Sequence, residues 1–215
     1  MTDAVGFVLA GGQSSRMGAD KALVQFGGQP LIAHALRILR DAGLASAIAG
    51  ARSDLSAYAP VIPDESPGLG PLGGICAALS ATCAQWAVFI SVDLPLLPVS
   101  LIRCLLFHAQ ITESPITIAS INGFPQTFPA VIRHEARPTL EQELQSGRLG
   151  CYAAYQASAS QLGRETSVLP VEVLVQCGQV SDPDGLEPPR WFSNVNSPVD
   201  LARAAARRVT PHRVS

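Results

Sequence analysis

The sequence predicts an α/β protein with a three-layer α/β/α, Rossmann-like fold around a mostly parallel central sheet. Two observations carry this prediction. Strand-like and helix-like segments alternate along the 215 residues, as they do in successive βαβ units. The strand-like segments are apolar throughout, as strands covered on both faces are. With a hydrophobic fraction of 47%, the chain can build one sizeable core, and we expect a single domain.

The expected strands are short apolar runs that end at glycine, aspartate or another polar residue. The run VGFVLA ends at two glycines, and WAVFISVD ends at an aspartate. In chain order the expected strands cover residues 5–10, 45–51, 61–64, 86–93, 116–121, 129–133 and 171–177.

The expected helices show apolar residues at helical spacing together with start and stop signals. Proline at the first turn and glycine at the end mark 30–43 and 138–147. Ser197, Pro198 and Asp200 approach a capping box at the start of the last helix. The expected helices cover residues 30–43, 53–58, 74–84, 98–110, 138–147 and 197–208. The segment 178–191, rich in proline, glycine and acidic residues, is expected to be a surface loop.

Composition excludes several classes of function. The formal net charge of −2 gives no basic footprint for nucleic acid. No stretch approaches the ~18 apolar residues of a membrane-spanning helix, and the N-terminus has no basic segment typical of a secretory signal. The five cysteines include no C-x-x-C pair, so we expect mostly buried, reduced thiols in a cytoplasmic protein rather than disulfides or a zinc site.

Candidate binding residues follow the expected strands. In open parallel sheets, ligands bind beyond the carboxyl ends of the strands. LAGGQSSRMGADKAL (9–23) follows the first strand, GLGPLGG (68–74) follows VIPD, Asp93 ends WAVFISVD, and NVNSP (194–198) precedes the last helix. We therefore expect these four segments to meet at one edge of the sheet.

The segment 9–23 has the composition of a phosphate-binding loop. Its glycines allow successive backbone N–H groups to point into one concavity, and Arg16 and Lys21 add positive charge. The order G-G-x-S-x-R-M-G-x-D-K matches neither the Walker A loop nor the G-x-G-x-x-G fingerprint. The alternative is a glycine turn that carries two surface cations.

The other three segments each have a ligand-binding and a purely structural interpretation. One carboxylate plus phosphate oxygens is a usual environment of Mg²⁺, so Asp93 is a candidate metal ligand; it could instead cap the following helix. The glycines of 68–74 either admit a base or ribose or form a turn before a helix. Asn194 and Asn196 could face one ligand together or cap the last helix.

Together, LAGGQSSRMGADKAL, GPLGG, FISVDLPLLP and NVNSPVDL resemble, in this order and spacing, the molybdenum cofactor guanylyltransferases. These are nucleotidyltransferases with a glycosyltransferase-A-like fold, and the resemblance covers nearly the whole chain. It implies transfer of GMP from GTP to the terminal phosphate of molybdopterin, giving molybdopterin guanine dinucleotide and pyrophosphate. It also implies Mg²⁺ as cofactor and possible maturation partners of molybdoenzymes. Within one domain, 1–215, residues 1–110 would bind nucleotide, 111–208 would bind the acceptor, and 209–215 would form a tail.

The resemblance also implies roles for individual residues. Nucleotide contacts fall on the first loop and on the segment around GPLGG, catalysis on two cations and one carboxylate, and acceptor contacts on two asparagines. The nucleotide-binding residues would be Leu9, Ala10, Gly11, Gly12, Gly18, Lys21, Asp64, Gly70, Gly74 and Asp93; the catalytic residues Arg16, Lys21 and Asp93; the acceptor-binding residues Asn194 and Asn196; and the Mg²⁺ ligand Asp93.

One departure concerns recognition of the base. The family's asparagine after the second strand, which contributes to guanine recognition, corresponds to Ala49 here, so a base contact must come from the backbone or elsewhere. Two alternatives therefore stay open: a related transferase that uses CTP or a sugar phosphate, and a non-catalytic nucleotide sensor or delivery protein. The sequence shows no nucleophile–base pair, and we expect the histidines (His34, His108, His134 and His212) at the surface.

Overall fold

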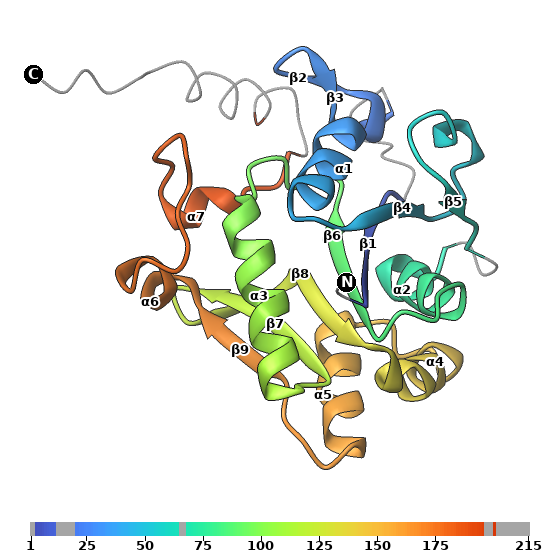
Figure 1. Cartoon of the computed structure of the whole chain (residues 1–215). Coiled ribbons are helices and arrows are strands. Elements are labelled where there is room, and N and C mark those ends of the chain that lie inside the picture. The colour runs from blue at the N-terminus through green and yellow to red at the C-terminus, as the bar shows by residue number, and fades with distance from the viewer. Residues whose placement is uncertain (1–2, 12–19, 65–67, 196–199, 201–215) are drawn as a thin grey trace, which may run out of the picture.

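The computed structural model describes residues 3–11, 20–64, 68–195 and 200, and their central feature is a seven-stranded sheet of order β5-β4-β1-β6-β8-β7-β9 (Figure 1). Strand β8 is antiparallel to its neighbours β6 and β7, while the other pairings are parallel. The α/β class and the mostly parallel sheet are confirmed. The strands are β1 (Ala4–Leu9), β4 (Ala45–Ala49), β5 (Val61–Ile62), β6 (Trp86–Ser91), β7 (Ile116–Ile121), β8 (Phe124–Arg133) and β9 (Ser167–Pro170).

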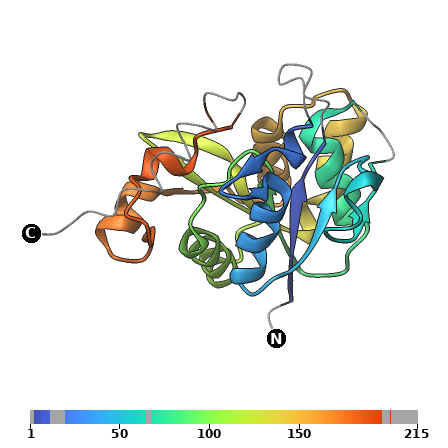
Figure 2. The same ribbon diagram turned by 90° about the horizontal axis from the view of Figure 1, so that it is seen from above.

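Helices cover both faces of this sheet, which gives the expected three layers (Figures 1 and 2). On one face lie α1 (Leu31–Asp41), α3 (Val99–Thr112), α6 (Val171–Gln176) and α7 (Pro188–Trp191); on the other lie α2 (Gly70–Ser80), α4 (Arg137–Gln145) and α5 (Cys151–Gln161). The 3₁₀ turns are η1 (Lys21–Leu23), η2 (Ser53–Leu55) and η3 (His134–Ala136), and β2 (Gln25–Phe26) pairs with β3 (Gln29–Pro30) in a small hairpin.

Burial on both faces explains why the strands are apolar without alternation. On β1, Val8 belongs to the core layer under α1 and α3, while Phe7 belongs to the layer under α2 and α5. On β6, Val88 and Phe89 divide in the same way, and the rings of Phe7 and Phe89 stack with centroids 5.3 Å apart. Successive residues of each strand thus bury their side chains in different cores.

The start and stop signals of the expected helices are mostly confirmed. Pro30 and Pro98 are the N-cap residues of α1 and α3, where their fixed φ suits the entry into a helix. Gly43 follows α1 with φ +90°, and Gly147 follows α4 with φ +76°, a backbone region that glycine adopts at little cost. The short helix expected at 53–58 is η2.

The expected strand 171–177 is wrong, because these residues form α6. Pro170 is the N-cap, and the buried side chains Val171 and Leu174 are one helical turn apart. The β-branched valines of this segment favoured a strand. The strand in this region is instead β9, which ends at Pro170, immediately before α6. Tertiary packing of the buried pair thus overrides local β-propensity.

Two further boundaries differ from expectation, and one helix was not expected. Helix α2 starts at Gly70 instead of residue 74, so the GPLGG segment forms its first turns with Pro71 near the N-terminus. Strand β8 starts at Phe124 instead of 129, in spite of two prolines within it. Helix α5 was not predicted, because its buried positions are occupied mainly by small residues such as Ala154 and Ser158.

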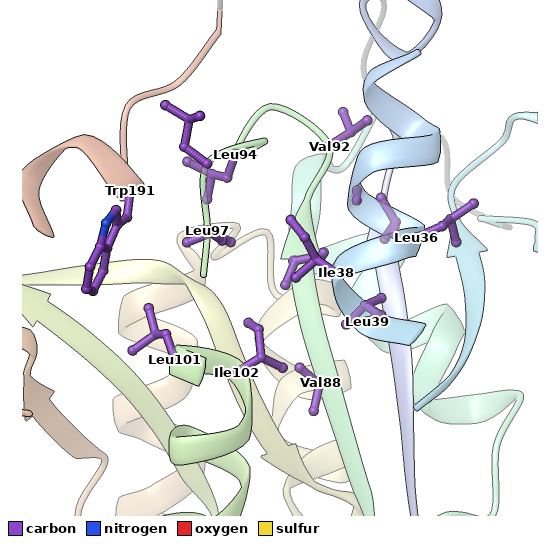
Figure 3. Packing of buried hydrophobic residues seen from close by; sticks show 14 of the residues in the cluster. Leu36, Ile38, Leu39, Val88, Val92, Leu94, Leu97, Leu101, Ile102 and Trp191 are labelled. Atoms are coloured by element: carbon purple, nitrogen blue, oxygen red, sulfur yellow. The ribbon is translucent and has the colours of Figure 1, made fainter. Parts of the chain in front are cut away.

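The segment 178–191 is a largely exposed loop, as expected, but it is anchored and ends in α7. Val180 and Trp191 are each 1% exposed, and Trp191 packs beside Leu97 and Leu101 (Figure 3). The Ser100 hydroxyl donates to the carbonyl of Ser181 (2.6 Å). Apart from Asp200, the helix expected at 197–208 lies outside the described residues. Within the described part of the chain, no helix is long and apolar enough to cross a membrane.

Candidate active site

The strand order places a topological switch point between β1 and β6. The chain runs from β1 outward to β4 and β5 and then returns to β6 on the other side of β1. In open α/β sheets, ligands bind beyond the carboxyl ends of the strands at such a point. Leu9 at the end of β1 pairs with Ser91 at the end of β6, and the N–H of Val92 donates to the carbonyl of Leu9 (3.2 Å). The segments that leave β1 and β6 therefore start side by side.

An ion pair joins these two segments. Lys21 Nζ donates to Asp93 Oδ2 at 2.8 Å, with the two side chains 17% and 18% exposed. Lys21 is the single lysine in the sequence, a signal of its importance that motif spacing alone did not use. The helix after Asp93 has Pro98 as N-cap and no side-chain capping bond, so the alternative role of Asp93 as a helix cap is wrong.

Packing holds the backbone of Asp93 in place. Its neighbours Val92 and Leu94 are 7% and 5% exposed and point into the core layer of α1 and α3 (Figure 3). An isolated carboxylate between two buried residues is costly unless it is paired. The ion pair with Lys21 offsets the free-energy cost of burying the Asp93 carboxylate, which lies beyond the carboxyl end of β6.

The segment before the last helix reaches the same place. The N–H of Val195 donates to the carbonyl of Asp93 (3.0 Å), and the Val195 side chain is 1% exposed. Asn194 is exposed beside it, and Asn196 lies outside the described residues. The expected convergence of the β1, β6 and NVNSP segments is thus present at Lys21, Asp93 and Val195.

Backbone atoms make the contacts between β1 and β4. The N–H of Ala10 donates to the carbonyl of Ala49 (3.1 Å). Gly50 has φ +142°, and a Cβ at Gly50 would lie 3.0 Å from the Gly11 nitrogen. Gly50, which the sequence reasoning did not select, therefore has to be glycine for both its conformation and this close approach.

The candidate residues of the α2 side also pack closely. A Cβ at Gly74 would lie 3.1 Å from Leu9 Cδ2, and one at Gly73 would lie 2.9 Å from Asp64 Oδ2. These glycines let the start of α2 approach β1 and bring the Asp64 carboxylate against the first turns of the helix, where negative charge is favourable. Gly70 opens the helix with φ +70°. Gly73 and Gly74 therefore have a packing role inside α2, and the alternative of a turn before the helix is wrong for GPLGG.

Ala49 is buried instead of facing solvent. It is 1% exposed and belongs to the core layer that also contains Leu9, Leu72 and Ile75. Of the candidate residues, Gly12, Arg16, Gly18 and Asn196 lie outside the described residues.

Two charged residues near Lys21 were missed. Asp20 is the N-cap of η1, with its carboxylate accepting the N–H of Ala22 (3.1 Å), and Arg52 donates to both Asp20 and Asp54. The capping pattern of an aspartate directly before a short turn could have identified Asp20. The contact between Arg52 and Asp20 leaves no signal in the sequence, because it joins two loops.

Histidines and cysteines differ in part from expectation. His34 is 2% exposed, and its Nε2 lies 2.5 Å from the carbonyl of Phe26, so the prediction of a surface residue is wrong there. Cys76 and Cys151 are buried, whereas Cys83 and Cys177 are exposed.

Comparison with known proteins gives one family. Residues 6–161 match the model of the MobA-like NTP transferase domain. The molybdenum cofactor guanylyltransferase of Vibrio atlanticus (strain LGP32) is 31% identical over 91% of this chain and 92% of that protein. The enzyme of the same name from Vibrio cholerae serotype O1 is 32% identical over 93% of this chain and 90% of that protein.

Solved structures share the fold. Molybdopterin-guanine dinucleotide biosynthesis protein A from Archaeoglobus fulgidus superposes with a TM-score of 0.72 at 22% identity, covering 94% of this chain and 96% of that chain. CMP:2-keto-3-deoxy-manno-octonic acid synthetase, complexed with CTP, superposes with a TM-score of 0.65 at 15% identity, covering 94% and 97%. The chain therefore belongs to the MobA-like NTP transferase family, with the molybdenum cofactor guanylyltransferases, and is a nucleotidyltransferase.

Proposed function

We propose that this protein transfers GMP from GTP to the terminal phosphate of molybdopterin, forming molybdopterin guanine dinucleotide and pyrophosphate. The observation that carries the proposal is the Lys21–Asp93 pair at the β1/β6 switch point of a chain that belongs to this family. A cation and a carboxylate at that point suit a nucleoside triphosphate and its metal ion.

The chemistry needs little covalent help from the protein. An oxygen of the acceptor phosphate attacks the α-phosphorus of GTP, a new P–O–P linkage forms, and the bond between the α-phosphorus and the bridging oxygen breaks. The electron pair of that bond leaves with pyrophosphate. Because the acceptor phosphate is already anionic near neutral pH, no general base is required, in keeping with the absence of a nucleophile–base pair from the sequence motifs.

Lys21 and Arg16 are assigned to the triphosphate. Charge develops on the leaving pyrophosphate during the transfer, and a fixed cation stabilises that charge more than it stabilises the bound substrate. In the structure Lys21 pairs with Asp93. Binding of the triphosphate therefore requires Lys21 to share or exchange that partner.

The backbone beside Lys21 is assigned to the nucleotide. Leu9 ends β1 at the switch point, and Ala10 and Gly11 follow it. Gly11 has open space on its Cα, since none of the described residues other than its chain neighbours lies within 4 Å of a Cβ built there. Gly12 and Gly18 would continue this cradle. Asp64, Gly70 and Gly74 at the start of α2 would close the side away from Lys21.

Asp93 is a suitable ligand for Mg²⁺. Among the residues that the structure describes, no group of three or more acidic, histidine or cysteine side chains is placed to hold a metal by itself. One carboxylate that completes its metal sphere with substrate phosphates is the usual arrangement for Mg²⁺. The bound ion would neutralise negative charge on the phosphates. Asp93 would hold the ion against the triphosphate, while packing of Val92 and Leu94 keeps the carboxylate in place.

Asn194 and Asn196 are assigned to the acceptor. The Val195–Asp93 backbone bond places Asn194, which is exposed, next to the segment that carries the metal ligand. In an extended segment, Asn196 would project on the same side as Asn194, because alternate residues face the same way.

The test is pyrophosphate release by the purified protein with molybdopterin, Mg²⁺ and one nucleotide at a time. We expect release with GTP that depends on both molybdopterin and Mg²⁺. Because Ala49 replaces the asparagine of the family, CTP is the specific alternative, and higher turnover with CTP would move the assignment to cytidylyl transfer. Binding of GTP without release from any nucleotide would indicate a sensor or delivery protein.

A further inference from the structure

Arg52, in the loop between β4 and η2, connects two loops through two carboxylates. Its Nε donates to Asp54 Oδ1 (2.9 Å) and its terminal nitrogen NH2 to Asp54 Oδ2 (2.7 Å), which is a bidentate contact within its own loop. The same NH2 also donates to Asp20 Oδ2, which belongs to the segment that follows β1. The Arg52 side chain is 17% exposed, less than that of Asp20 or Asp54.

The two oxygens of Asp20 have different partners. Oδ1 accepts the N–H of Ala22 and caps η1, and Oδ2 accepts from Arg52. Lys21 is the first residue of that turn, and its Nζ reaches Asp93. A continuous set of contacts therefore runs from Arg52 through Asp20 and the η1 turn to Lys21.

We propose that Arg52 is a positioning residue that fixes the Asp20 cap and thereby orients Lys21 toward the phosphates of the nucleotide. The proposal rests on the proposed function for the role of Lys21. Arg52 acts indirectly, because its Nε and NH2 are already bound by carboxylates. The contact also couples the loop that follows β4 to the turn that carries Lys21.

The charges favour a permanent contact. The hydrogen bond from Arg52 lowers the pKa of Asp54 below its usual range, and the reciprocal bond raises the pKa of Arg52. Arg52 and Asp54 are thus both ionised at neutral pH. Loss of the guanidinium would leave Asp20 and Asp54 without their shared cation and free Asp20 Oδ2 from its restraint.

The test compares Arg52→Gln, Asp20→Asn, the double variant and Asp54→Asn. Asp20→Asn keeps an oxygen that can cap η1 and removes the ion pair, while Asp54→Asn leaves the Arg52–Asp20 contact in place and is the matched control. Competition titrations with a fluorescent GTP analogue give the Kd of GTP and of GMP. Reductive ¹³C-methylation of the single lysine gives one side-chain NMR signal that reports directly on Lys21.

We expect Arg52→Gln and Asp20→Asn each to weaken GTP binding about tenfold, the size of one charge-assisted hydrogen bond, while GMP binding changes less than about twofold. The double variant should be no weaker than either single variant, because both remove the same contact. The Lys21 signal should shift in both variants and stay unchanged in Asp54→Asn.

Several results would overturn the proposal. GTP binding as in the wild type, equal weakening of GTP and GMP, an additive double variant, or an unchanged Lys21 signal would each show that Arg52 only stabilises its loop or contacts the nucleotide directly. These measurements do not depend on turnover. If the wild type bound GTP but released no pyrophosphate, the proposed function would fail while the Arg52 proposal could still hold.

Discussion

On the flank of the site where β1 meets β6, charged side chains make the contacts, whereas on the flank where β1 meets β4, backbone atoms do. We call these the β6 flank (Lys21, Asp93 and Val195) and the β4 flank (Gly11, Ala49 and Gly50). The β6 flank holds an ion pair between two loops. At Gly11, Ala49 and Gly50 the contacts are a backbone hydrogen bond and a glycine contact, and the charged Arg52–Asp20 contact comes later in the same two segments. One flank of the site thus stabilises charge, and the other sets its shape. Substitutions on the two flanks should therefore impair different properties of the protein.

The largest effect is expected from Asp93→Ala on the β6 flank. Removal of the carboxylate should lower kcat about 1,000-fold, because the metal ligand and the partner of Lys21 are lost together. Pyrophosphate release at saturating Mg²⁺ measures the loss. Asp41→Ala, at an exposed aspartate that ends α1, is the control and should keep wild-type turnover.

Lys21→Ala should lower kcat about 100-fold without unfolding the protein. The Lys21 side chain starts the η1 turn and belongs to neither core layer, so its removal costs the ion pair with Asp93 but no core packing. We expect Mn²⁺ binding, measured by electron paramagnetic resonance, to be retained in this variant and lost in Asp93→Ala. A folded Lys21→Ala protein with full guanylyl transfer would contradict the role of Lys21.

On the β4 flank, Gly50→Ala should reduce stability and nucleotide binding together. The added methyl group meets the Gly11 nitrogen at 3.0 Å and the backbone is held at φ +142°, so we expect a loss of about 1–3 kcal/mol. For a chain of this size, that lowers Tm by roughly 5 °C. Gly163→Ala also places a side chain at positive φ (+67°), in the left-handed region where the strain is smaller than at φ +142°, and no described residue lies within 4 Å of the new Cβ. It should leave the Kd of GTP unchanged.

Ala49→Asn tests whether the missing amide matters to base choice. Because Ala49 is 1% exposed in the α2-side core, we expect the polar amide to cost about 1–3 kcal/mol of stability. Because position 49 is buried, the ratio of kcat/KM for GTP to that for CTP should change less than about threefold. An amide that bound the base would contribute about 1.5 kcal/mol, which would change this ratio about tenfold. A tenfold rise in that ratio would show instead that position 49 reaches the base.

The smallest effect concerns thiols near the β4 flank. Burial raises the pKa of Cys76 in α2 to about 12 and that of Cys151 to about 11. At pH 8 iodoacetamide should therefore label Cys83 and Cys177, which are exposed, and leave the two buried thiols unmodified in the native protein. Mass spectrometry of the labelled chain gives the count.

The raised pKa values of Cys76 and Cys151 also predict how the stability of the protein depends on pH. The folded protein keeps these protons more tightly than the unfolded chain, whose cysteines ionise near their ordinary pKa of 9.0. The contribution of these two thiols to the free energy of unfolding should therefore be constant below pH 9 and fall above it. Urea unfolding at pH 8 and pH 10 measures the difference, and replacement of both residues by alanine should reduce it.

The sequence predicted the β6 flank better than the β4 flank, for a physical reason. Lys21 and Asp93 are ionisable residues at the ends of apolar runs, and residue type alone indicates their chemistry. Gly50 looks like an ordinary strand-end glycine until its distance to Gly11 is known. The Arg52–Asp20 contact joins residues that are remote in sequence, which no local pattern encodes.

The elements of the fold also divide into those that the sequence predicted and those that it did not. Long apolar runs and proline or glycine boundaries identified most strands and helices. The predictions failed where small or β-branched residues were involved, at α5 and α6, because the packing partner decides the structure there. The antiparallel direction of β8 was missed although the sequence signals it: Asn122 and Gly123, with φ of +50° and +78°, form the two-residue turn that joins β7 and β8 as a hairpin.

The bond from Val195 to the Asp93 carbonyl bears on how the protein is made. A ribosome synthesises β1, Lys21, β6 and Asp93 before it synthesises Val195. Val195 comes nearly at the end of the described chain, so the wall that it forms beside Asp93 is added last. A nascent chain would therefore contain both members of the ion pair before it contains Val195, and a chain stopped before Val195 would carry the charges of the site without this final enclosure.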